Sequence, residues 1–173
     1  WMMDQPSPPH IFNDLALALD GSVYATTTLF GQIFRVSPEM EEMELILETP
    51  GSHNNGITLG PEERYLFFTL DRTISRMDLE TGAVVALEGP EGADVGTDGL
   101  YLVDGALISV KPRMTQVLRL ELNDAMDGLD GVQVLSEGHS DFVYPTTGVV
   151  VGDDLVLVAT SFALTYAPAS GAL

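Results

Sequence analysis

Four oxygen-bearing side chains occupy similar places at the start of four similar segments of the chain. They are Asn13, Asn55, Asp98 and Thr147, and each directly precedes a Gly or an Asp that opens an apolar run. Amide and carboxylate oxygens are the ligands that a hard cation such as Ca²⁺ prefers. A structural interpretation competes with this one, because Asn and Asp before Gly also form turns readily. The residue types predict a divalent-cation site if the fold brings the four segments together.

The three histidines suggest a second chemistry, general-base catalysis near neutral pH. His10, His53 and His139 each precede one of the same segments and are separated by 43 and 86 residues. Their distances from the segment starts differ, and their spacing is not that of a zinc motif. Exposed loop histidines are the structural alternative to a cluster at one site.

The elements that must position these residues are short strands. Apolar runs of four to eight residues, rich in β-branched and aromatic side chains, alternate with turns that contain Gly, Pro, Asn or Asp. Examples are residues 22–28, 65–70, 83–87, 116–122 and 155–159. The pattern predicts an all-β chain.

The strands are organised in repeats. Aligning Leu15, Ile57, Leu100 and Val149 superposes four units, with steps of 42, 43 and 49 residues. A period near 40–50 residues with four strands per unit is typical of a β-propeller. Since the first strand of each propeller blade lines the central channel, the four oxygen-bearing residues should converge near one axis.

The repeats define a single partial propeller domain over residues 1–173. The units span about 11–50, 53–90, 96–136 and 145–166, which is about three and a half four-stranded blades. Propellers have four to eight blades, and an open one exposes strand edges that invite association. We therefore expect either a fragment of a longer propeller, which the start at Trp1 favours, or self-association that closes the ring.

The charge balance limits the partners. The chain has 7 Lys and Arg residues against 26 Asp and Glu, a net charge of −19. Phosphate backbones and anionic membrane surfaces would repel it, so we expect neither a nucleic acid nor a membrane as a partner. The absence of cysteine excludes disulfides and cysteine nucleophiles, and it leaves the compartment open between cytoplasm and export.

Several segments together resemble the senescence marker protein/regucalcin/gluconolactonase family. These segments are residues 12–16, 55–61, 64–66, 97–100 and 145–153, and the resemblance covers most of residues 10–162. It implies a six-bladed propeller with one divalent metal in its channel and, in several members, hydrolysis of sugar lactones.

The resemblance also assigns roles to particular residues. Asn55 and Asp98 correspond to metal ligands, and Asn13 corresponds to an asparagine near substrate and metal. We place Thr147 with Asn13 on the substrate side. Ca²⁺ is the expected cation, with Zn²⁺ and Mg²⁺ as alternatives, and a small lactone or ester is the expected substrate.

Two departures from the family pattern affect these expectations. The third protein ligand of the family is a Glu in the first blade, and this chain begins after that blade. An Arg that helps hold sugar acids stands two residues before the Asn-Asp motif, where this chain has Ile11. Sugar-acid specificity is therefore not expected.

The expected chemistry is metal-assisted hydrolysis, in which the metal polarises the carbonyl and lowers the pKa of a bound water. Asp98 is the predicted catalytic base for that water. A non-catalytic propeller that acts as a binding scaffold is the alternative, because one fold hosts many functions.

Overall fold

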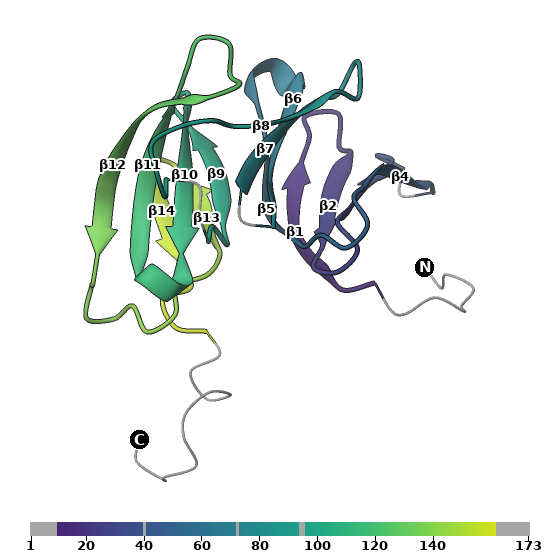
Figure 1. Ribbon diagram of the computed structural model, residues 1–173. Helices are drawn as coiled ribbons and strands as arrows, with labels where there is room; N and C mark the ends of the chain where they lie inside the picture. Colours follow the sequence, from purple (N-terminus) through teal and green to yellow (C-terminus); the bar gives the residue numbers. More distant parts are fainter. Residues whose placement is uncertain (1–9, 40, 72, 94–95, 162–173) are drawn as a thin grey trace, which may run out of the picture.

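The computed structural model describes residues 10–39, 41–71, 73–93 and 96–161. Within them the chain forms three four-stranded antiparallel sheets and one two-stranded sheet (Figure 1). Each sheet is a meander whose strands follow one another in chain order. The predicted all-β class and the four-stranded blades are confirmed.

The strands and two short 3₁₀ helices have the following bounds. The first sheet contains β1 (Phe12–Leu17), β2 (Val23–Thr27), β3 (Gln32–Val36) and β4 (Met43–Glu48). The second contains β5 (Asn54–Leu59), β6 (Tyr65–Leu70), β7 (Thr73–Asp78) and β8 (Val84–Ala86), with η1 (Pro61–Glu63) between its first two strands. The third contains β9 (Leu100–Val103), β10 (Ala106–Lys111), β11 (Gln116–Leu122) and β12 (Leu129–Glu137), with η2 (Pro112–Met114) before β11. The fourth contains β13 (Gly148–Val151) and β14 (Asp154–Leu157).

Two hydrophobic cores lie between the sheets. Phe67 and Phe68 are adjacent in β6, so their side chains point to opposite faces of the second sheet. Phe67 belongs to the core shared with the third sheet, which includes Leu107, and Phe68 belongs to the core shared with the first sheet, which includes Tyr24. Full burial of each phenylalanine contributes about 2–3 kcal/mol, so the second sheet holds its neighbours on both faces.

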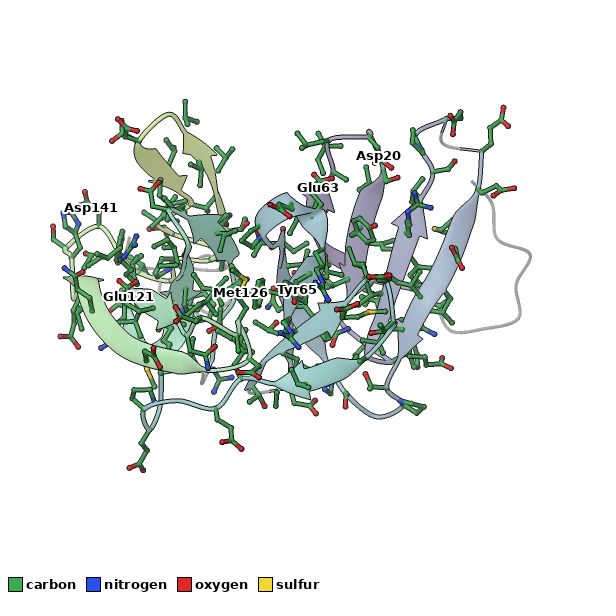
Figure 2. All side chains as sticks on the ribbon, turned by 90° about the horizontal axis from the view of Figure 1, so that it is seen from above. Asp20, Glu63, Tyr65, Glu121, Met126 and Asp141 are labelled. Carbon is green, nitrogen blue, oxygen red and sulfur yellow. The ribbon has the colours of Figure 1, made fainter. Side chains whose placement is uncertain are left out.

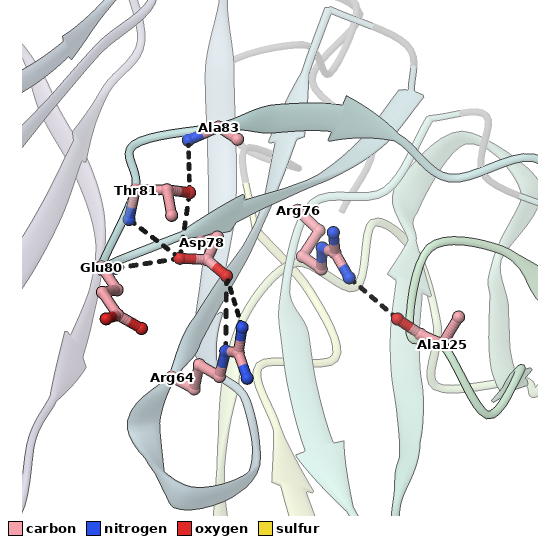
Figure 3. Close-up of polar contacts among 7 residues, drawn as sticks. All are labelled: Arg64, Arg76, Asp78, Glu80, Thr81, Ala83 and Ala125. Atoms are coloured by element: carbon pink, nitrogen blue, oxygen red, sulfur yellow. Dashed lines mark hydrogen bonds and ion pairs between the residues drawn. The ribbon is translucent and has the colours of Figure 1, made fainter.

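A polar network holds the outer part of the second sheet (Figure 3). Asp78 accepts hydrogen bonds from the backbone N–H of Thr81 at 2.9 Å and from Arg64 at 3.3 Å. These contacts lower the pKa of Asp78, and the hydrogen bond from the Thr81 N–H has the largest effect. Arg76 donates to the carbonyl oxygen of Ala125 at 2.8 Å, which links the second sheet to a turn of the third.

The fourth sheet contains half of the strands of a blade. The fourth unit was expected over residues 145–166, and residues 162–166 lie outside the described residues. Seen from above, the four sheets fan out around a common region, with the first and fourth sheets at the two ends of the series (Figure 2). None of the described segments is a helix of the length and hydropathy needed to span a bilayer.

Candidate cation-binding and catalytic site

The inner strands β1, β5, β9 and β13 together line a groove of about 590 Å³. Its lining includes Asp14, Thr58 and Tyr101 among mostly aliphatic residues, and the described lining contains no Lys, Arg or His. The groove occupies the place where the repeat pattern predicted a channel. The lining includes Asp14 and Gly148, which follow Asn13 and Thr147 in the chain, but none of the four candidate residues itself.

Buried hydroxyl groups fix the start of β5. The pairing of β5 with β6 shifts between Asn54 and Ile57, a bulge of the kind that re-aims side chains. At this point Thr69 Oγ1 accepts a hydrogen bond from the Asn55 N–H at 2.9 Å, and Thr26 Oγ1 donates to the Asn55 carbonyl at 2.7 Å. Asn55 is therefore held by residues of two sheets.

Gly56 allows the inner strands of the second and third sheets to approach each other. A Cβ at this position would collide with the Asp98 carbonyl oxygen and would lie 2.8 Å from the Leu100 backbone nitrogen. Only a residue without a side chain fits there. The close approach brings Asn55 beside Asp98.

Asp98 has a partly buried carboxyl group with a strongly raised pKa. Its backbone N–H donates to the Val110 carbonyl at 2.8 Å, and the Asn55 amide donates to its side chain. Burial raises its pKa to about 6, the Asp14 carboxylate adds to the rise, and the Asn55 hydrogen bond opposes it. The expectation that Asn55 and Asp98 lie together agrees with this geometry.

Asp14 is a site residue that the sequence reasoning missed. Burial raises the pKa of Asp14, while hydrogen bonds from the backbone N–H groups of Leu15 and Ile57 lower it. The Leu15 bond is 2.9 Å long. A signal was present, because Asp14 occupies the position held by Gly56 and Gly99 in the next two units. A carboxylate in the place of a repeated glycine points to a special role.

Asn13 lies apart from this pair of carboxyl groups. Its side chain is exposed, and its Nδ2 donates to Thr28 Oγ1 at 2.8 Å. Its predicted contact with substrate stays a prediction. The structure places the next residue, rather than Asn13, in the electrostatic environment of Asp98.

Thr147 is exposed and contacts Tyr101, a second residue that the sequence reasoning missed. The two hydroxyl oxygens lie 3.0 Å apart, and the Gly148 N–H donates to the Tyr101 oxygen at 2.6 Å. Burial raises the pKa of Tyr101, and the carboxylates of Asp14 and Asp98 add to the rise. Tyr101 therefore connects the carboxyl pair to β13.

The hydrogen bonds correct the alignment of the fourth repeat. In the third sheet Asp98 donates to Val110, whose own N–H donates to Gly99. In the fourth sheet the Thr146 N–H donates to the Val158 carbonyl, and the Val158 N–H donates to the Thr147 carbonyl. Thr146, which is buried, is thus the equivalent of Asp98, and the expected equivalence of Thr147 is wrong by one residue. The apolar run 148–151 gives no sequence signal for its register.

The three histidines have separate surroundings. The His10 ring lies edge-on to Phe34 at 5.6 Å, His53 Nδ1 lies 3.8 Å from Asp71, and His139 accepts a hydrogen bond within its own loop. Across the residues that the structure describes, no three His, Cys, Asp or Glu side chains are grouped so that they could hold a metal. The structure does not gather the histidines into a catalytic cluster.

The donor set beside the groove fits a hard cation better than a soft one. It consists of the Asp14 and Asp98 carboxylates and the side-chain amide of Asn55, whose nitrogen donates a hydrogen bond to Asp98. Oxygen donors suit Ca²⁺ or Mg²⁺, whereas Zn²⁺ favours nitrogen and sulfur. Burial raises the pKa of both carboxyl groups, and a bound cation would stabilise their ionised forms.

No family model matches the chain, and no curated protein matches it by sequence. Solved structures do match it. Virginiamycin B lyase from Staphylococcus aureus is 17% identical with a TM-score of 0.65, over 88% of this chain and 50% of the lyase. The Malassezia sympodialis allergen Mala s 1 is 17% identical with a TM-score of 0.64, over 87% of this chain and 49% of the allergen. A gluconolactonase from Xanthomonas campestris is 17% identical with a TM-score of 0.58, over 80% of this chain and 50% of the enzyme.

These similarities define the fold. The chain is all-β and corresponds to about half of a six-bladed propeller chain. It spans about half the length of the structures it matches. At such low identity the similarity carries the architecture and not the activity.

Proposed function

We propose that the chain carries part of the active site of a metal-dependent hydrolase that opens lactones or cleaves esters. The observation that carries the proposal is the convergence of Asp14, Asn55 and Asp98 beside the inner-strand groove. The fold similarity to a gluconolactonase agrees with the proposal, as does the resemblance of the sequence segments.

The residues have distinct roles in this proposal. Asn55 and Asp98 hold a divalent cation, which when bound polarises the substrate carbonyl and acidifies a water molecule. Asp98 would accept a proton from the attacking water. The Asn55 amide orients the Asp98 carboxylate, and Asn13 and Thr147 contact substrate hydroxyl groups.

The charges beside the groove favour an uncharged substrate. Asp14 and Asp98 are acidic, and the described groove lining contains no basic residue that could pair with a substrate carboxylate. A neutral lactone or ester avoids repulsion from these carboxylates. This agrees with Ile11 at the position where the family binds sugar acids through Arg.

A binding scaffold without catalysis is the second candidate. Val132 and Val134, exposed apolar side chains on one face of β12, favour it, because exposed apolar patches mark interaction sites. Under this alternative Asp14 and Asp98 would either bind a cation that only stabilises the fold or bind no cation.

The first experiment is calcium titration by calorimetry, using the wild-type chain, Asp98→Asn and Asp14→Asn. Each substitution should weaken Ca²⁺ binding on the order of 10- to 100-fold, while Asp104→Asn in an exposed turn should leave it unchanged. If both Asp98→Asn and Asp14→Asn bind Ca²⁺ as the wild-type chain does, the proposed cation site is wrong.

The second experiment is an assay of lactone and ester hydrolysis with and without a chelator. Hydrolysis that requires the metal and disappears in Asp98→Asn supports the proposal. Cation binding without hydrolysis of any compound in the panel would favour the scaffold.

A further inference from the structure

The groove has a tyrosine at a position where the two preceding units have small side chains. Tyr101 follows Leu100 in β9, and the corresponding residues are Ala16 in β1 and Thr58 in β5. All three line the groove. The repeat therefore does not require an aromatic ring at this position, and the phenol of Tyr101 calls for an explanation of its own.

Two features of the structure fix the Tyr101 hydroxyl group. A Cβ at Gly99 would lie 2.7 Å from the phenol oxygen and 2.8 Å from the Thr146 carbonyl oxygen, so only glycine at this position leaves room for the hydroxyl. On the other side, the Gly148 N–H donates to the phenol oxygen at 2.6 Å, and the Thr147 hydroxyl lies 3.0 Å from it. The phenol oxygen is thus held where β13 begins.

The contacts of this hydroxyl pair leave one of its hydrogens uncommitted. Tyr101 and Thr147 carry two hydroxyl hydrogens, and the bond between them uses one, whichever residue donates it. The Gly148 bond uses a lone pair of the phenol oxygen and not its hydrogen. Tyr101 lines the groove, and Thr147 does not. We therefore assign the uncommitted hydrogen to Tyr101, with Thr147 donating to the phenol oxygen.

The charged groups near the phenol are acceptors. Burial raises the pKa of Tyr101, and the carboxylates of Asp14 and Asp98 are close enough to add to the rise. Ionised carboxylates only accept hydrogen bonds. The Asn55 amide nitrogen already donates to Asp98. The Tyr101 hydroxyl therefore adds a neutral donor beside two carboxylates.

We propose that the Tyr101 hydroxyl, held by Thr147 and Gly148, donates a hydrogen bond to the leaving oxygen of a lactone or ester substrate. The inference rests on the proposed function. In that function the cation takes the carbonyl oxygen and Asp98 takes the attacking water, so the leaving oxygen is the third reacting oxygen and has no assigned partner. It gains negative charge as its bond to the carbonyl carbon breaks, and a fixed donor stabilises that charge.

This role makes the contribution of Tyr101 depend on the leaving group. An alkyl alcohol leaves with its negative charge concentrated on one strongly basic oxygen, whereas a nitrophenol spreads the charge into its ring. The donor should therefore matter greatly for an alkyl ester and little for a nitrophenyl ester of the same acid. A residue that only supports the fold would affect both esters equally.

The test compares kcat and KM of the wild-type chain, Tyr101→Phe and Thr147→Val at saturating Ca²⁺. The substrates are the ethyl and nitrophenyl esters of one short acid. Tyr101→Phe should lower kcat for the ethyl ester about 100-fold and keep kcat for the nitrophenyl ester within a few-fold of wild type. Thr147→Val should show the same dependence on the leaving group with a smaller loss, because the phenol is still held by Gly148.

Tyr65→Phe is the matched control for the loss of a phenol. Tyr65 is also partly buried, but its ring lies against Arg64 and Arg76 and does not line the groove. This control should leave kcat unchanged for both esters.

Tyr101→Phe also deprives the Gly148 N–H of its phenol partner. Circular dichroism and an unchanged Ca²⁺ affinity should therefore confirm that this variant keeps its fold. Thr147→Val retains the contact of Tyr101 with Gly148, so it tests the hydroxyl pair independently of any loss of folding in Tyr101→Phe.

The outcomes separate this inference from the proposed function. Equal losses for the two esters, or no loss in either variant, would overturn the role of Tyr101 while hydrolysis that requires the metal and Asp98 upheld the proposed function. A wild-type chain without metal-dependent hydrolysis would overturn the proposed function, and this inference with it.

Discussion

At the scale of single residues, the two carboxyl groups beside the groove dominate the electrostatics. Burial raises the pKa of both Asp14 and Asp98, and the Asp14 carboxylate adds to the rise at Asp98. The folded protein therefore stores an unfavourable interaction whenever both are ionised. A bound cation would remove that cost, so the site links metal binding to stability.

The pH dependence of stability follows from the raised pKa of Asp98. The folded state holds the Asp98 proton up to about pH 6, whereas the pKa of an Asp in an unfolded chain is 3.8. Protonated Asp98 contributes to the free energy of unfolding in full below pH 3.8. This contribution, at most about 3 kcal/mol, is lost as the pH rises through 6. With chelator present, Asp98→Asn should gain free energy of unfolding relative to wild type as the pH rises through this window.

Urea unfolding at a series of pH values measures this difference. Asp104→Asn, at an exposed turn next to β9, serves as the control and should follow the wild-type curve. A difference between Asp98→Asn and wild type that does not change with pH would show that Asp98 does not titrate as the geometry requires.

At the scale of the elements, the site depends on how closely β5 approaches β9. The bulge in β5, the hydroxyl groups of Thr26 and Thr69 and the absence of a side chain at Gly56 act together. The sequence predicted that Asn55 and Asp98 would meet, because the repeat places both at the start of an inner strand. It did not single out Asp14, because the repeat drew attention to the amide side chains of Asn13 and Asn55. Asp14 follows Asn13, at a position where the next two units have glycine.

Gly56→Ala tests the close approach directly. The added methyl group would collide with the Asp98 backbone, so we expect a loss of about 1–3 kcal/mol of stability and weaker cation binding. Gly131→Ala in β12 is the matched control, because its new Cβ would lie 3.7 Å from the nearest side chain. Equal thermal midpoints for the two variants would contradict the tight packing of β5 on β9.

At the scale of the whole molecule, the main feature is the large negative charge of the chain. The net charge of −19 destabilises the compact state by self-repulsion. Salt screens this repulsion over about 10 Å at 0.1 M.

The thermal midpoint should therefore rise with sodium chloride, measured by scanning calorimetry on the wild-type chain at low protein concentration. An uncharged osmolyte at equal osmolality serves as the comparison and should act independently of the charge. A midpoint that stays constant or falls with sodium chloride would mean that local ion pairs, such as Arg64 with Asp78, outweigh the global repulsion.

By itself the sequence determined the strands, the four-stranded repeat and the meeting of Asn55 with Asp98, since alternation and turn residues are local signals that repeat along the chain. Only the tertiary structure decided the partners of those residues. The register of the fourth unit could not be deduced because a run of valines from 149 to 151 fits either face of a strand. The role of Asp14 and the separation of the histidines depend on distances between blades, which no local pattern encodes.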